Sequence, residues 1–128
     1  MNDDADRQVK SVIWQTGAAA ATLGVVLSPI PLADEVILVP LYGVMAARIG
    51  RARGVGLSAL PWRPIGGAVL AGLAARAVTN LGVALIPGVA AVANAVTAAA
   101  LTRLLGHYAD TAVRERLQPE VPDGAAVA

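Results

Sequence analysis

Residues 23–31 read LGVVLSPIP, and residues 81–88 read LGVALIPG. In both stretches an apolar run ends at proline, which has no backbone N–H and interrupts a helix. The sequence therefore predicts an all-α protein built from two helical hairpins, each broken near its middle by proline. The residues that mark these structural turns are Pro29, Pro31, Pro87 and Gly88.

Charged residues are nearly absent from the two apolar stretches. Asp34 and Glu35 are the only charges between residues 11 and 47, and Arg76 is the only one between residues 64 and 102. Across the chain, hydrophobic residues make up 56% and charged residues 15%, whereas soluble domains average about 25% charged. This composition favours a bundle embedded in a membrane or one that buries an unusually apolar surface.

The positions of the proline and glycine residues that end helices predict one domain with four helices. We expect a flexible flank over residues 1–10, a single four-helix domain over residues 11–117 and a disordered tail over residues 118–128. The expected helices cover residues 11–27, 32–49 (kinked at Pro40), 65–85 and 89–117, with a loop over 50–64. The two LGV-x-L motifs and the Ile-Pro pairs also indicate an internal repeat, in which each half is helix, proline break, helix and glycine.

Segment lengths are compatible with a membrane but do not decide how deep the hairpins go. A span needs roughly 17–25 apolar residues, and twelve residues separate Glu35 from Arg48 in the second helix. Hairpins that cross the bilayer and hairpins that re-enter it both stay open. Nine of the ten basic residues lie near the termini or in the central loop, which by the positive-inside rule places those regions in the cytoplasm. A soluble bundle with a basic loop is the competing interpretation.

Five polar residues interrupt the apolar stretches and form the candidate partner site. An arginine near the centre of a membrane helix costs roughly 2.5–3.5 kcal/mol on insertion scales, so it usually faces an interior partner. We expect a polar seam that links helices, with a conduction or binding path as the alternative. Carboxylates at a helix start are also the ordinary complement of the helix dipole. The residues concerned are Asp34, Glu35, Arg76, Asn80 and Asn94.

No residue pattern indicates catalysis. The chain has no cysteine and a single histidine, His107, which has no ligand partner at metal spacing. Walker, nucleophile-elbow and HExxH motifs do not occur, so we expect a non-enzymatic protein without metal or cofactor. The central basic patch is expected to attract anionic lipid rather than nucleic acid, since the net charge is only +1. It comprises Arg48, Arg51, Arg53 and Arg63.

Several motifs, taken in order, resemble a known family. Residues 27–34 (LSPIPLAD), residues 45–49 (MAARI) and residues 85–89 (LIPGV) follow one another, with Thr102 and Gly106 downstream. This order resembles the bacterial domain of unknown function 697, whose members carry a P-x-P-x-x-D turn, a Met-rich second helix and a late IPG. The resemblance covers roughly residues 18–112. The positions that carry over are Pro29, Pro31, Asp34, Pro87 and Gly88.

The resemblance implies a helical module associated with the bacterial inner membrane and often with Era-like GTPase domains. No GTPase motif occurs here, so any GTPase partner would act in trans. Pro40-Leu41 also stands where related sequences often carry polar residues. We expect an anchor, scaffold or remodelling platform that binds the lipid bilayer and forms a homo-oligomer. The alternatives are a soluble, cytoplasmic bundle that self-assembles through apolar faces, and a small oligomeric conductor of ions or solutes.

Overall fold

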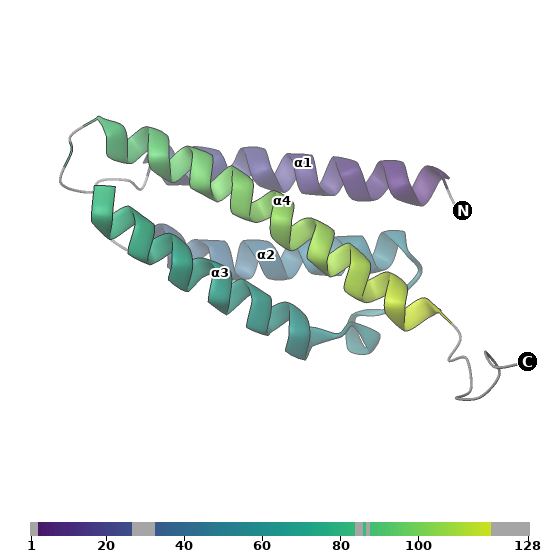
Figure 1. The fold of residues 1–128 in the computed structure, drawn as a ribbon. Coiled ribbons are helices and arrows are strands. Elements are labelled where there is room, and N and C mark those ends of the chain that lie inside the picture. The colour runs from purple at the N-terminus through teal and green to yellow at the C-terminus, as the bar shows by residue number, and fades with distance from the viewer. Residues whose placement is uncertain (1–2, 27–32, 84–85, 87, 119–128) are drawn as a thin grey trace, which may run out of the picture.

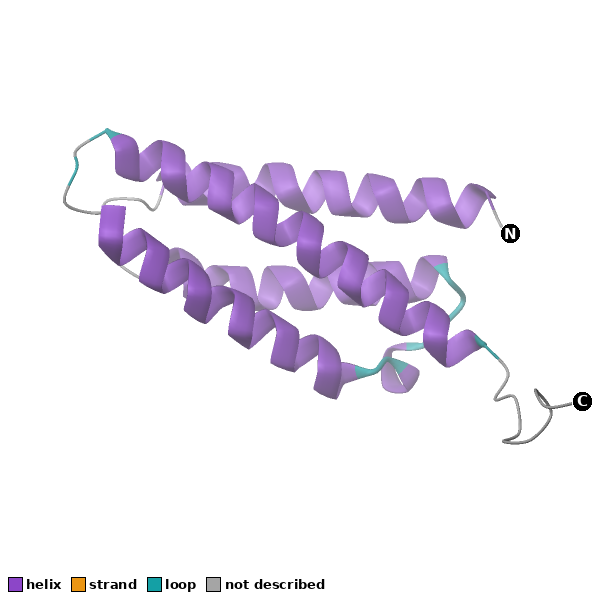
Figure 2. Cartoon of the chain, in the orientation of Figure 1, coloured by secondary structure: helices purple, strands orange, loops and turns teal. Residues whose placement is uncertain are grey.

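The computed structural model describes residues 3–26, 33–83, 86 and 88–118. These residues form an all-α bundle, which confirms the predicted fold class (Figures 1 and 2). Its helices are α1 (Asp3–Val26), α2 (Ala33–Ala52), α3 (Trp62–Val83) and α4 (Val89–Leu117), with a short 3-10 helix, η1 (Leu57–Ala59).

Helix α4 is the centre of the bundle. It packs against α1, α2 and α3, whereas within the described residues α1 and α3 do not touch. Helices α1 and α4 run antiparallel, and Ile13 lies next to Gly106 while Gly24 lies next to Asn94. The end of α1, the start of α2, the end of α3 and the start of α4 therefore gather at one end of the bundle (Figure 1).

One hydrophobic core runs through the bundle. The largest side chains that are fully buried come from α2, and Tyr42, Met45 and Ile49 line its inner face. Val9 and Ile13 of α1, with Leu73 of α3 and Leu105 of α4, pack against that face. These residues recur at three- and four-residue spacing, which is the spacing of one face of a helix.

Three element boundaries differ from the sequence prediction. Helix α1 begins at Asp3, so residues 3–10 are helical rather than a flexible flank, and Ala5 and Val9 are buried there. Helix α2 continues through Pro40 to Ala52. Helix α3 begins at Trp62, which places Pro64 in its first turn, where a missing N–H costs nothing because that group has no helical partner anyway.

The fourth helix has the predicted bounds, Val89–Leu117. Gly88 precedes it with a φ of 83°, a conformation that glycine adopts without steric cost. The other turn residues, Pro29, Pro31 and Pro87, lie outside the described residues, and so does the predicted tail beyond Gln118.

Candidate functional site

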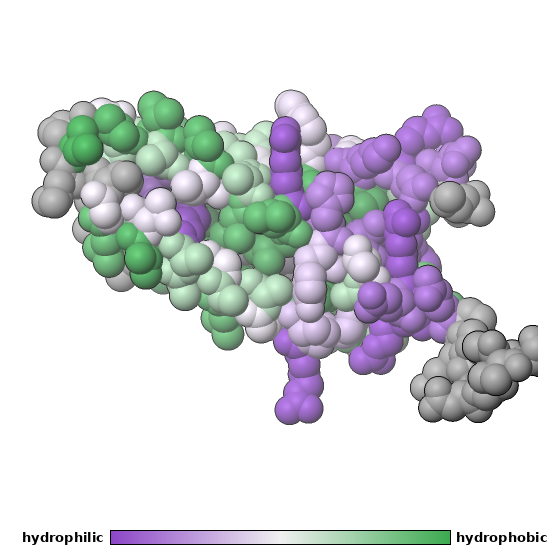
Figure 3. All heavy atoms as spheres, viewed as in Figure 1, coloured by the Kyte–Doolittle hydropathy of each residue, from purple (hydrophilic) through white to green (hydrophobic). Residues whose placement is uncertain are grey.

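The bundle divides across its long axis into two halves of different chemistry. We call residues 16–26, 35–47, 70–83 and 86–102 the apolar half, and residues 3–15, 48–69 and 103–118 the charged half. Glu35 and Arg76 are the charged residues within the apolar half, and Asp34 lies directly before it in α2. The charged half holds all the other charges among the described residues. Figure 3 shows this division as hydrophobic colour at one end of the surface and hydrophilic colour at the other.

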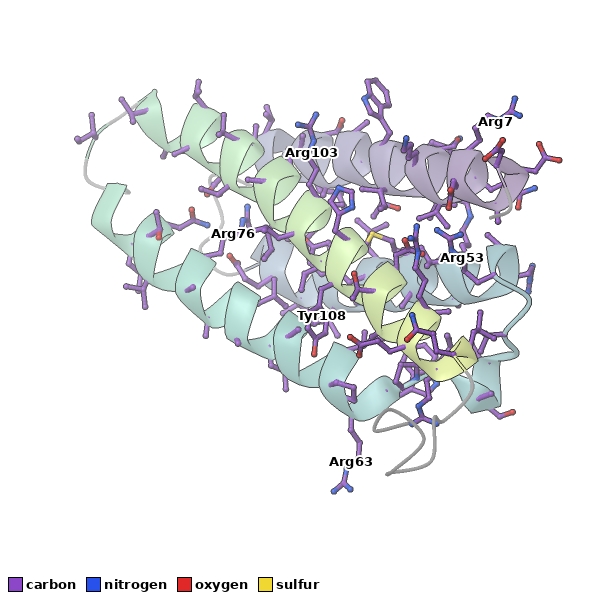
Figure 4. The ribbon with its side chains drawn as sticks, turned by 45° about the vertical axis from the view of Figure 1, so that its right-hand side comes forward. Arg7, Arg53, Arg63, Arg76, Arg103 and Tyr108 are labelled. Carbon is purple, nitrogen blue, oxygen red and sulfur yellow. The ribbon has the colours of Figure 1, made fainter. Side chains whose placement is uncertain are left out.

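Arg76 lies at the centre of a polar cluster inside the apolar half. Its residue is 4% exposed, and its Nη1 atom is 2.9 Å from Glu35 Oε1. Arg76 Nε donates to Thr97 Oγ1 at 3.2 Å, and Nη2 donates to the carbonyl oxygen of Asn94 at 3.1 Å. The guanidinium therefore connects α3 to both α2 and α4, and Figure 4 shows it inside the bundle.

Two asparagines complete the cluster. Asn80 Nδ2 donates to Glu35 Oε1 at 3.3 Å, so Glu35 accepts from two residues of α3. Within the described residues, Asn80 Oδ1 and Asn94 Oδ1 are buried acceptors without a hydrogen-bond donor. The structure thus brings together Glu35, Arg76, Asn80 and Asn94, four of the five residues in the predicted seam. The side chain of Asp34 lies outside the described residues.

The chemistry of this cluster suits a link between helices. Removing an ion from water costs several kcal/mol, which a partner of opposite charge and good hydrogen bonds must offset. Arg76 has a carboxylate, a hydroxyl and a backbone carbonyl as partners. Among the residues that the structure describes, no group of three or more His, Cys, Asp or Glu side chains could hold a metal ion.

A second ionic cluster lies in the charged half. Arg53 follows α2 directly, and its Nε and Nη2 atoms donate to both carboxylate oxygens of Asp110 at 2.8 and 3.0 Å. Its Nη1 atom is 2.6 Å from Asp6 Oδ1. Arg114 Nη2 approaches Asp6 Oδ1 at 3.2 Å and Asp110 Oδ2 at 3.0 Å. This network ties the start of α1, the end of α2 and the last turns of α4 together.

The network perturbs its own ionisation. The hydrogen bond from Arg53 holds the pKa of the Asp6 carboxyl below its ordinary value, because the donor favours the charged form. The pKa of Arg53 lies above its ordinary value, chiefly because of its hydrogen bond to Asp110. Both groups are therefore charged at neutral pH, and the ion pairs are complete there.

This network corrects part of the predicted basic patch. The side chain of Arg53 is only 10% exposed, so it is a structural cation and does not face lipid. The reason is that two carboxylates from other helices lie within hydrogen-bond distance of it. Arg48, Arg51 and Arg63 are exposed, and Figure 4 shows Arg63 projecting away from the bundle. The four-residue spacing of Asp110 and Arg114 is the spacing of neighbours on one helix face, whereas the sequence carries no signal that Asp6 and Arg53 join them.

Exposed aliphatic side chains cover all four helices of the apolar half. Val26 is 65% exposed, Val36 73%, Val78 72% and Val92 63%. Large apolar side chains are also exposed on the charged half, but there they are fewer and stand among charges. The remaining exposed members in the apolar half are Val25, Ile37, Val39, Val44, Leu70, Leu81, Ile86, Val89 and Val96.

Two described helices are long and apolar enough to cross a membrane: residues 62–82 in α3 and residues 89–117 in α4. Less than a third of the most apolar stretch of each helix is buried within the bundle, 22% in α3 and 28% in α4. This finding is compatible with a membrane location and does not give an orientation.

Known proteins offer no identification. No protein-family model, curated protein or solved structure matches this chain. The resemblance to the domain of unknown function 697 therefore stays a prediction from the motifs, and the function has to be inferred from the structure itself.

Proposed function

We propose that this protein is a non-enzymatic membrane module whose apolar half inserts into a lipid bilayer and whose charged half stays in water. It would serve as an anchor, scaffold or remodelling platform. The observation that carries the proposal is the set of exposed aliphatic side chains that all four helices carry in the apolar half. Monomeric soluble proteins rarely expose large contiguous apolar patches, and a bilayer would cover the exposed aliphatic side chains of all four helices at once.

The distribution of cations supports the same placement. Lys10, Arg48 and Arg103 are exposed near the border between the halves, one on each of three helices. Basic residues in this position attract anionic headgroups and favour the cytoplasmic side. The proposal therefore places the charged half in the cytoplasm of a bacterium, against the inner membrane.

Different observations bear on what the protein assembles with at the membrane. A homo-oligomer is compatible with the exposed small residues of α3, such as Gly67 and Ala71. A GTPase partner acting in trans rests on the sequence resemblance alone. The contacts of Arg76 favour an interhelical link over a conduction path, because its guanidinium already donates to three groups.

A pair of matched substitutions tests the proposal. Val92 in the apolar half and Leu57 in the charged half are both 63% exposed. Val92→Glu places a carboxylate in lipid one turn into α4, and we expect membrane partitioning to fall about tenfold, because the cost there is below the roughly 2.5 kcal/mol of a charge at mid-depth. Leu57→Glu should partition like the unmodified protein. The measurement is the fraction of protein in the membrane pellet after alkaline carbonate extraction.

The competing function is a soluble assembly that buries the same aliphatic side chains between copies. It predicts a discrete species of high mass without detergent, and Val92→Glu would then shift that species toward monomer. Wild-type protein that stays in the carbonate supernatant as such a species would overturn the membrane proposal.

A further inference from the structure

A narrow groove follows the seam between α1 and α4. Its volume is about 240 Å³, smaller than the 300–1,000 Å³ typical of pockets for drug-sized molecules. Small residues make its floor and walls: Gly17, Ala18 and Ala21 from α1 and Ala99 from α4. Because these side chains are so short, the groove has room for one narrow apolar chain lying along the helices.

Two large side chains mark one end of the groove. Trp14 and Arg103 line it, and Trp14 is 69% exposed. Ile13 lies next to Gly106. A Cβ atom placed on Gly17 would lie 3.8 Å from the Thr102 methyl carbon. This antiparallel register puts Trp14 and Arg103 at nearly the same level, at the border between the two halves. The apolar part of the groove therefore runs from that border into the apolar half.

The border end of the groove is electropositive. Arg103 is exposed and has no hydrogen-bond or ion-pair partner among the residues that the structure describes. Figure 4 shows it on the side of α4 that lies beside α1. One helical turn further into the charged half, α1 carries Lys10 and α4 carries His107, both exposed. The nearest acids in the network of the charged half, Asp6 and Asp110, are already paired with Arg53.

We propose that this groove binds one anionic phospholipid, with an acyl chain lying over the small residues and the phosphodiester contacting Arg103. The inference rests on the proposed function, since the groove reaches headgroup depth only if the apolar half is in the bilayer. Charge complementarity selects the occupant: a cation without a partner stands at headgroup level beside an apolar channel and an exposed indole. Basic pockets between helices on the cytoplasmic side bind anionic headgroups in this way.

Quenching of Trp14 fluorescence tests the proposal. Trp62→Phe serves as a common background so that Trp14 is the only tryptophan. The protein is placed in vesicles of equal parts phosphatidylcholine and phosphatidylglycerol, with either one or the other lipid brominated on its acyl chains. We expect brominated phosphatidylglycerol to quench Trp14 more strongly than brominated phosphatidylcholine.

Matched variants separate a built site from general attraction. Arg103→Gln should reduce the preference for phosphatidylglycerol about fivefold, the effect of one basic residue near an anionic surface. Arg116→Gln removes an exposed arginine outside the groove and outside the central basic patch, and it should leave the preference unchanged. Ala99→Leu fills the groove and should also reduce the preference, whereas Ala71→Leu on the exposed side of α3 should not.

The outcomes distinguish this inference from the proposed function. Equal quenching by the two lipids, or an equal effect of Arg116→Gln and Arg103→Gln, would overturn the groove while leaving membrane insertion intact. Protein that fails to sediment with vesicles of any composition would overturn the proposed function itself.

Discussion

Arg76 is the residue on which the apolar half depends most. It carries a charge inside the apolar half and pairs there with Glu35, and their side chains are 2% and 12% exposed. Neither ion could be left alone there, because an unpaired buried charge is far more costly than a paired one. The pair therefore specifies how α2 and α3 meet, and the bond to the Asn94 carbonyl extends that constraint to α4.

We expect Arg76→Ala to destabilise the bundle by about 3–5 kcal/mol, because it leaves the Glu35 carboxylate buried without its partner. Arg103→Ala, the loss of an exposed arginine, should cost less than about 0.5 kcal/mol. Thermal unfolding in detergent, followed by the loss of helical circular dichroism, measures both.

A double variant distinguishes charge pairing from loss of packing. Arg76→Met combined with Glu35→Gln removes both charges, and it should recover most of the stability lost in Arg76→Ala. If Arg76→Ala unfolds at the same temperature as Arg103→Ala, the pair is not a structural link. In that case an assay of ion flux in liposomes would become the next measurement.

At the scale of the elements, helices α1 and α4 approach each other closely along their seam. A Cβ placed on Gly24 would lie 2.9 Å from the Asn94 carbonyl oxygen, which belongs to backbone and cannot rotate away. Small residues permit this approach, as they do between helices in membranes. The same carbonyl accepts from Arg76, so the position of α1 and the polar cluster are coupled through one atom.

Gly24→Ala should therefore destabilise the protein although alanine is the better helix former. Overpacking costs about 1–3 kcal/mol, which outweighs the gain of about 1 kcal/mol from helix propensity. Gly67→Ala is the matched control in α3, since a Cβ there meets nothing within 4 Å, and it should stabilise by up to about 1 kcal/mol. Melting temperatures in detergent compare the two; an equal rise in both would refute a tight contact between α1 and α4.

At the scale of the whole molecule, the proposed insertion raises the question of whether the helices of the apolar half are long enough to cross a bilayer. Residues 36–47 of α2 and 89–102 of α4 extend about 18 and 21 Å along their helices. The hydrocarbon core is about 30 Å thick. A short span is accommodated by local thinning at a fraction of a kcal/mol per Å. Leaving the non-helical backbone at Ile86 and Gly88 within the hydrocarbon would cost more, so we favour hairpins that reach the far interface.

Cysteine labelling tests this placement, because the chain contains no cysteine of its own. Ile86→Cys should react with a membrane-impermeant maleimide applied to the far side of the membrane. Ser58→Cys, in η1 of the charged half, should react only from the cytoplasmic side. An Ile86→Cys variant protected from both sides would mean that the hairpins re-enter the membrane without crossing it.

Much of the helical layout could be read from the sequence. The bounds of α4 were predicted to the residue, and the polar residues of the apolar half were recognisable because each stands in an otherwise uncharged stretch. Glu35, Arg76, Asn80 and Asn94 were found in this way, although their mutual distances were not. The N-terminal turns of α1 were missed, because the polar residues 3–10 give no sign of the buried face that Ala5 and Val9 form.

The helices and the separation of apolar from charged segments follow from the amino-acid sequence, because helix breaks and charge gaps are local properties of the chain. The tertiary structure was needed to show that Arg53 belongs to an ion network, that Arg103 has no partner among the described residues and that a groove runs beside it. Arg53 and Asp110 are 57 positions apart. Such a pairing depends on how the helices cross, and it leaves no periodic trace in the sequence.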